Sequence, residues 1–196
     1  MMSGALLYNA ARMHARIIGG AAFSHFVTKG LGLPIEPVDF NSFPQEGEVG
    51  HIVRHALSLY SGLLEANSAT SKFIQALLLL EYLADPDNYQ KFKEVKKIVA
   101  RYVASGPKEY ERVLARFEEL THKEDPNSKM EVGFRTRIVH LGDRLENLVP
   151  ESDDRQRLFE ELDGYIRPII DHMISHSSLD FEAYLKIRDQ LRPFEA

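Results

Sequence analysis

One segment limits the possible folds more than any other, because it is apolar on nearly every side. Residues 72–84 have helical spacing, and Gln75 and Glu81 are the only polar residues in the interior of the segment. A helix without a polar face has to be covered by neighbours on several sides. The segment therefore predicts a central helix surrounded by other helices.

The rest of the chain from residue 48 onward supplies these neighbours. Apolar residues recur at helical spacing, and we find no alternating strand pattern of useful length there. Besides the central helix, the predicted helices cover residues 49–66, 88–104, 108–120, 133–148, 153–176 and 180–191. We therefore predict an all-α fold, a helical bundle with extra N- and C-terminal helices.

The first 47 residues differ from this pattern. Residues 5–18 are compatible with an amphipathic helix, whereas Gly, Pro and Asn dominate residues 30–50 and indicate a loop. We predict an N-terminal extension over residues 1–47, partly helical and then a loop, followed by one helical-bundle domain over residues 48–196.

Composition excludes several classes of function. The chain has 24 Lys and Arg residues and 29 Asp and Glu residues, which gives a net charge of −5. A negative net charge does not attract nucleic acid to the protein as a whole. We expect no DNA partner, and any RNA site has to be a local patch. The absence of cysteine excludes disulfides, thiolate zinc sites and cysteine nucleophiles.

The sequence also bears on the compartment. The longest apolar run, residues 76–80, is too short to span a bilayer, and no secretory signal is evident. We expect a cytoplasmic protein without a membrane partner.

Two blocks of residues carry a recognisable signature. The first is Ala-Leu-Leu-Leu-Leu-Glu-Tyr-Leu at residues 76–83, and the second is Arg-Thr-Arg-Ile-Val-His at residues 135–140. Together they resemble the HEPN superfamily, and most closely its Apea-like branch, in which an Ala-Leu-x-x-Leu-Glu-x-Leu helix precedes Arg-Ser-Lys-Ile-Val-His. The resemblance covers residues 48–176, with one departure: Leu141 stands where the family often has glycine.

The resemblance implies a helical bundle that forms a homodimer. In active members, an arginine and a histidine from both subunits meet in a cleft that cuts RNA without a metal or other cofactor. Carried over to this chain, the catalytic positions are Arg135 and His140, and Thr136 is the polar residue that assists beside the arginine.

The chemistry of these residue types agrees with such a role. RNA cleavage needs a base for the 2′-hydroxyl proton, an acid for the leaving oxygen and positive charge on the phosphorane oxygens. Histidine titrates near neutrality, and arginine offers a charged fork for phosphate oxygens. Arg137 shares a helix face with His140 and is a rival of Arg135 for the phosphate role.

Arg135 and Arg137 also have a structural interpretation, in which they form ion pairs that stabilise the fold. Arg135 and Arg137 have Glu81, Glu131 and Asp143 as candidate ion-pair partners. Glu81 itself has two interpretations: it assists the site by orienting an arginine of the 135–137 segment, or it occupies a single solvent-facing position on the central helix.

A further cluster of charge lies on the predicted helix 88–104. Lys93, Lys97 and Arg101 are spaced four residues apart and line one face, which makes them the best local patch for RNA. The alternative is a solvated face that Glu94 partly balances.

Two histidine pairs have the spacing of zinc ligands. His51 and His55 form one pair, and His172 and His176 form the other. Neither pair has the adjacent glutamate of a metalloprotease motif, and no third ligand is apparent, so we expect no metal site.

Three functional hypotheses follow. The first is a homodimeric HEPN-type ribonuclease, with stress or defence as its setting. The second is a non-catalytic module of the same fold that binds RNA, a nucleotide or a protein partner. A metal-dependent enzyme that uses the histidine pairs is the third.

Overall fold

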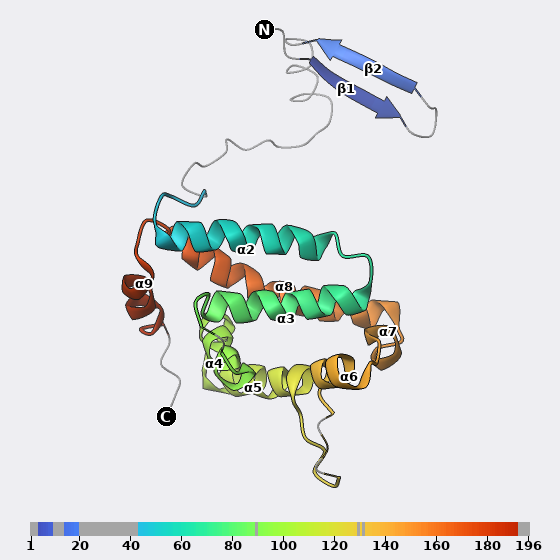
Figure 1. Cartoon of the computed structure of the whole chain (residues 1–196), viewed down its shortest axis with the longest axis vertical. Helices are drawn as coiled ribbons and strands as arrows, with labels where there is room; N and C mark the ends of the chain where they lie inside the picture. The colour runs from blue at the N-terminus through green and yellow to red at the C-terminus, as the bar shows by residue number, and fades with distance from the viewer. Residues whose placement is uncertain are drawn as a thin grey trace. The chain divides into compact units, whose positions relative to one another are not determined.

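The computed structural model describes residues 4–9, 14–19, 43–88, 90–128, 130 and 132–191. The chain divides into two compact units, residues 1–40 and residues 41–196 (Figure 1).

The described part of the first unit is a β-hairpin. Strands β1 (Gly4–Asn9) and β2 (His14–Gly19) are antiparallel, with Gly4 opposite Gly19 and Asn9 opposite His14. The prediction of an amphipathic helix over residues 5–18 is therefore wrong. Short apolar runs do not distinguish the two structures by periodicity alone, and the β-branched pair Ile17 and Ile18 favours a strand. Residues 10–13 and 20–42 lie outside the described part, and they include most of the predicted loop over residues 30–50.

The second unit is a helical bundle, and the all-α prediction is confirmed for its described residues. Figure 1 shows α2 and α3 side by side, and both also pack against the long helix α8. The helices are α2 (Glu48–Leu64), α3 (Ala69–Ala84), α4 (Phe92–Val103), α5 (Pro107–Thr121), α6 (Phe134–Leu141), α7 (Leu145–Leu148), α8 (Ser152–Ser175) and α9 (Phe181–Arg188).

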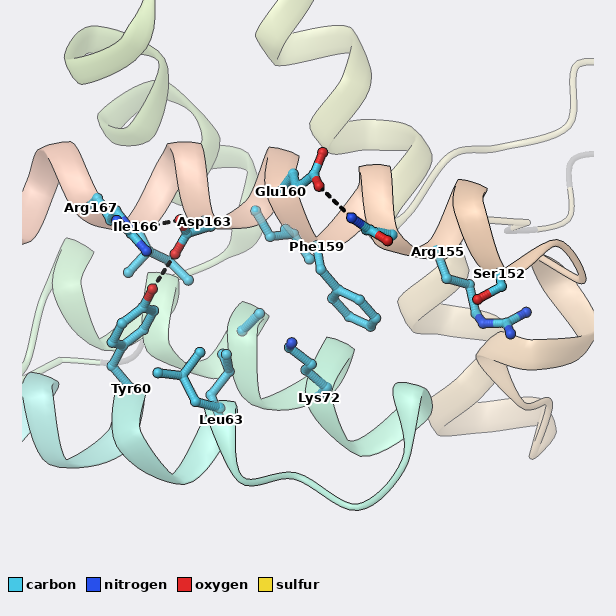
Figure 2. Close-up of a pocket in the computed structure, with 14 residues that line it drawn as sticks. Tyr60, Leu63, Lys72, Ser152, Arg155, Phe159, Glu160, Asp163, Ile166 and Arg167 are labelled. Atoms are coloured by element: carbon cyan, nitrogen blue, oxygen red, sulfur yellow. Dashed lines mark hydrogen bonds and ion pairs between the residues drawn. The ribbon is translucent and has the colours of Figure 1, made fainter. Parts of the chain in front are cut away.

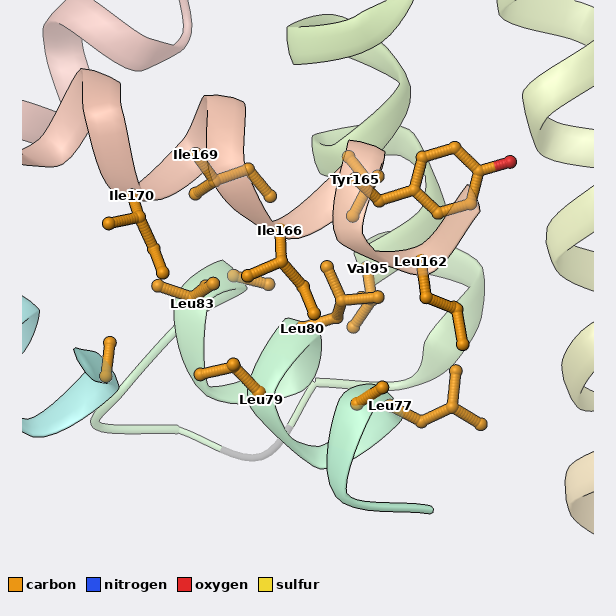
Figure 3. Close-up of a cluster of buried hydrophobic side chains, with 14 of the residues drawn as sticks. Leu77, Leu79, Leu80, Leu83, Val95, Leu162, Tyr165, Ile166, Ile169 and Ile170 are labelled. Atoms are coloured by element: carbon orange, nitrogen blue, oxygen red, sulfur yellow. The ribbon is translucent and has the colours of Figure 1, made fainter. Parts of the chain in front are cut away.

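Helix α3 is the central helix that its composition predicts. Figure 3 shows its leucines packed against apolar side chains of α4 and α8. The side chains of Leu77, Leu79, Leu80 and Leu83 are at most 1% exposed, and burying a leucine contributes about 1.5–3 kcal/mol. Leu78, in contrast, is 52% exposed, so one narrow stripe of α3 reaches the surface.

The predicted helix over residues 133–148 is two helices. Gly142 has a φ of 75°, a left-handed conformation that glycine adopts without steric cost. The backbone N–H groups of Gly142 and Asp143 both donate to the carbonyl of Arg137. These bonds replace the regular helical pattern, so α6 ends at Leu141. His140 consequently lies in the last turn of a short helix.

Polar contacts tie the short helix α7 to the start of α3. The carboxylate of Glu146 accepts hydrogen bonds from the Thr70 hydroxyl (2.7 Å) and from the backbone N–H of Ala69 (3.1 Å). These bonds favour the ionised carboxylate and lower the pKa of Glu146. The Thr70 oxygen in turn accepts from the Leu145 N–H at 2.8 Å. The segment that follows α6 is thus fixed to the central helix.

Candidate functional site

The candidate site is a pocket where the beginning of α4, the end of α5 and helix α6 meet. Its volume is about 330 Å³. The side chains that line it are mostly basic or aromatic, and they come from three stretches of sequence. They are Lys91, Phe92, Lys93, Thr121, His122, Arg135, Thr136 and His140.

Close backbone contact between α5 and α6 places the signature residues. A Cβ atom on Gly133, the N-cap of α6, would lie 2.4 Å from the carbonyl carbon and oxygen of Thr121, so only glycine allows this approach. The Thr136 hydroxyl donates to the same carbonyl oxygen at 3.0 Å. Thr136 is therefore a positioning residue that holds α6 against the end of α5.

The guanidinium of Arg135 has a defined environment at the pocket wall. Its central carbon lies 4.9 Å from the centre of the Phe92 ring, a cation–π arrangement. Glu81 of α3 attracts the same charge: burial raises the pKa of the Glu81 carboxyl, and the positive charge of Arg135 partly opposes that rise. Of the two interpretations of Glu81, this electrostatic attraction agrees with a role in orienting Arg135, and it acts without a direct ion pair between the two side chains among the described residues.

His140 is open to solvent at the edge of the pocket. Within the described part of the chain, its imidazole has no hydrogen-bond or ion-pair partner. Both ring nitrogens are therefore accessible to a ligand, as a proton-transfer group requires.

A second histidine, which the sequence did not single out, lines the same pocket. His122 directly follows the last residue of α5, and its Nδ1 lies 2.8 Å from the Thr121 hydroxyl oxygen. That hydroxyl donates its one hydrogen to the carbonyl of Phe117 at 2.6 Å, so it accepts from His122 Nδ1–H. The neutral ring then carries its free lone pair on Nε2, which suits it to accept a proton.

The signal for His122 in the sequence is weak. It stands in a polar loop 13 residues before Arg135, and nothing in the helical pattern connects the two. His122 comes to the same pocket as Arg135 because the loop between them folds back on itself. The backbone N–H of Asp125 donates to the carbonyl of Met130, and the backbone N–H of Val132 donates to the carbonyl of Lys123.

Arg137, the rival phosphate ligand, does not line this pocket. Its Nε lies 2.8 Å from a carboxylate oxygen of Asp143, one of the partners that the sequence offered. Glu131, another of these candidates, lies outside the described residues.

The predicted basic face of α4 is divided between two pockets. Lys93 lines the candidate site, whereas Lys97 and Arg101 line a separate pocket nearer α9. There Lys97 pairs with Glu94 at 3.3 Å, and Arg101 pairs with Asp189 at 3.4 Å. Lys91, just before α4, lines the candidate site in their place.

The charge of the pocket is one-sided. Lys91, Lys93 and Arg135 are cationic, two imidazoles accompany them, and no carboxylate lines this pocket among the described residues. Side chains of these types are suited to bind anionic oxygen atoms and to move protons near them.

The histidine pairs contact protein groups. The ring centres of His172 and His176 are 4.4 Å apart, and Nδ1 of His172 lies 3.2 Å from the Tyr184 hydroxyl. His55 packs edge-on against Tyr82. The described residues contain no cluster of three or more His, Cys, Asp or Glu side chains placed to hold a metal ion.

In the part of the chain that the structure describes, no helix combines the length and apolar character needed to cross a bilayer.

Comparison of the chain with protein-family models, with curated protein sequences and with solved structures finds no match to any of them.

Proposed function

We propose that this protein is a metal-independent RNA endonuclease of HEPN type that acts as a homodimer. The observation that carries the proposal is the pocket itself. It gathers Arg135 and His140 of the signature with His122 and two lysines, and its described lining holds no carboxylate that would repel a phosphate.

In the proposed reaction, one imidazole removes the proton from a 2′-hydroxyl, and the oxygen attacks the adjacent phosphorus. The bond from phosphorus to the 5′-oxygen breaks, and the second imidazole, in its protonated form, donates a proton to that oxygen. The products are a 2′,3′-cyclic phosphate and a 5′-hydroxyl. His140 and His122 supply both proton-transfer groups within one chain.

The cations stabilise the charge that develops on the phosphorane. Arg135 offers two parallel N–H donors to the non-bridging oxygens, and Lys91 and Lys93 of the same lining add positive charge. The ring of Phe92 contacts the guanidinium, and the charge of Glu81 attracts it, so both favour its position at the pocket before RNA binds.

Exposed apolar residues beside the site support the dimer. Val139 and Leu141 flank His140 and are 48% and 63% exposed. Large apolar side chains in such a cluster are typical of a surface that a partner covers. A second copy seated there would bring its own arginine and histidine close to the first set.

The test is incubation of the full chain with a mixed RNA pool in EDTA. We expect the His140→Ala variant to lose cleavage by about 10²–10⁴-fold, since this is the usual contribution of a general acid or base. The matched control is His51→Ala, which changes an exposed histidine that does not line the pocket. Cleavage by the His140 variant at the wild-type rate would refute the proposal.

The second candidate is a binding module without catalysis, favoured by the same three cations. It predicts that the wild-type chain binds RNA and leaves it intact. In that case Arg135→Ala would weaken binding, while His140→Ala would leave binding nearly unchanged. Filter binding at several salt concentrations, run beside the cleavage assay, separates the two functions.

A further inference from the structure

We propose that a groove between α2, α3 and α8 binds a small amphipathic anion, a carboxylate with an aliphatic or aromatic body. The groove has a volume of about 430 Å³, within the range of small-molecule sites. It shares no lining residue with the pocket of Arg135 and His140, so this inference does not depend on the proposed ribonuclease.

The floor of the groove is apolar. Leu63 of α2, Ala76 of α3 and Leu162 and Ile166 of α8 form it, and they are fixed in the core of the bundle. Leu64 stands at the rim, where its side chain is 58% exposed. An apolar ligand body seated here would remove exposed apolar surface from water, which favours binding.

The carboxylates of the groove are already engaged. Asp163 accepts a hydrogen bond from the Tyr60 hydroxyl and pairs with Arg167 at 2.6 Å. Glu160 accepts from the side-chain amide of Gln156 at 2.9 Å. The charge of Asp163 is thus balanced by Arg167, whereas the charge of Glu160 remains, and the described lining holds three cations against two carboxylates.

The other two cations of the lining are Lys72 and Arg155. The Lys72 ammonium lies 4.8 Å from the centre of the Phe159 ring, and Arg155 donates to the carbonyls of Val149 and Pro150. Neither forms an ion pair with a carboxylate among the described residues. The lining thus keeps an excess of one positive charge, and the Lys72 ammonium is the cation that a ligand can reach without displacing a hydrogen bond among the described residues.

The position of these two cations decides the chemistry of the ligand. Figure 2 shows Lys72, Phe159 and Arg155 toward one end of the groove, whereas Tyr60 and its Asp163–Arg167 pair lie toward the other. A ligand with an anionic head at Lys72 and an apolar body over Leu63 and Ile166 matches both the cation and the apolar floor of the groove.

The test uses decanoate as the probe, below its micellar concentration, with calorimetric titration of the full chain. Decanol, which has the same tail without the charge, is the comparison ligand. We expect decanoate to bind the wild type about tenfold more tightly than decanol.

Lys72→Met keeps an unbranched side chain over Phe159 and removes the charge. We expect it to weaken decanoate binding by about tenfold and to leave decanol binding unchanged. The matched control is Lys108→Met, an exposed lysine of α5 outside the groove, which should bind both ligands as the wild type does.

A second variant tests the position independently of Lys72. Leu64→Glu places a negative charge at the exposed rim, where the fold does not require leucine, and should abolish decanoate binding. Binding of decanoate that is unchanged in both variants, or equal binding of decanoate and decanol by the wild type, would overturn the proposal.

Discussion

His122 shows how the role of a single residue depends on the atoms around it. Its ring orientation follows from one hydroxyl hydrogen: Thr121 gives that hydrogen to Phe117, so the hydroxyl accepts from the imidazole. The nitrogen left with a lone pair in the neutral ring is the one that can take a proton from RNA. The proposed reaction therefore uses two histidines with separate tasks.

We predict that His122→Ala lowers RNA cleavage by about 10²-fold and changes its pH dependence. In the proposed reaction one imidazole acts as the base and the other as the acid, so the wild-type rate should pass through a maximum as pH changes. Without His122, one side of that maximum should disappear. The measurement is the single-turnover rate between pH 5 and pH 9, with His55→Ala as the matched control. A variant that keeps both sides of the profile would show that His122 transfers no proton.

At the level of elements, the site depends on the approach of α6 to the end of α5. Gly133 permits that approach, and Gly142 ends α6 just after His140. The two glycines act differently: the first allows backbone contact, whereas the second adopts a left-handed conformation.

The change Gly133→Ala should separate the two helices, because the new methyl group would meet the Thr121 carbonyl at 2.4 Å. We expect a loss of about 1–3 kcal/mol in unfolding free energy and a fall in RNA cleavage, since Arg135 and His140 move with α6. Chemical denaturation and the cleavage assay measure the two effects.

Gly62→Ala is the control for this change. Gly62 lies within α2 with no atom near an added Cβ, so alanine there should stabilise the protein by about 0.5–1 kcal/mol. If Gly133→Ala behaved in the same way, close contact between α5 and α6 would not be what places the site.

At the scale of the whole helical unit, α9 packs back onto the bundle through an aromatic and histidine cluster. The Tyr184 hydroxyl lies 2.6 Å from that of Tyr102 on α4 and 3.2 Å from Nδ1 of His172 on α8. Burial raises the pKa of Tyr102 to about 12 and lowers the pKa of His172 from its ordinary value of 6.5, and His176 adds to the lowering.

This cluster makes stability depend on pH. The unfolded chain protonates His172 more readily than the folded one, so the contribution of His172 to the unfolding free energy is fully present above pH 6.5 and is lost as pH decreases through that value. We predict that His172→Gln reduces the decline between pH 7.5 and pH 5.5 in urea denaturation, whereas His51→Gln does not. An unchanged slope in the His172 variant would mean that its imidazole titrates alike in both states.

The sequence by itself determined the helical class of the second unit and its centre. Apolar residues recur at helical spacing along this unit, and one of its helices is apolar on nearly every side. Such a helix is stable only when neighbouring helices bury it. The burial of Leu77, Leu80 and Leu83 therefore follows from the composition of the segment. The hairpin at residues 4–19 did not follow, because a short apolar run satisfies strand and helix alike.

Only the tertiary structure decided which side chains come together in the candidate site. Periodicity places residues on a face of their own helix, but it does not say which other segments face them. Lys93, His122 and Arg135 meet because a loop folds back and Gly133 lets two helices touch. Arg101, on the same helix as Lys93, turns to Asp189 instead, because α9 returns to that end of α4. These contacts join segments distant in sequence, and local patterns carry no information about them.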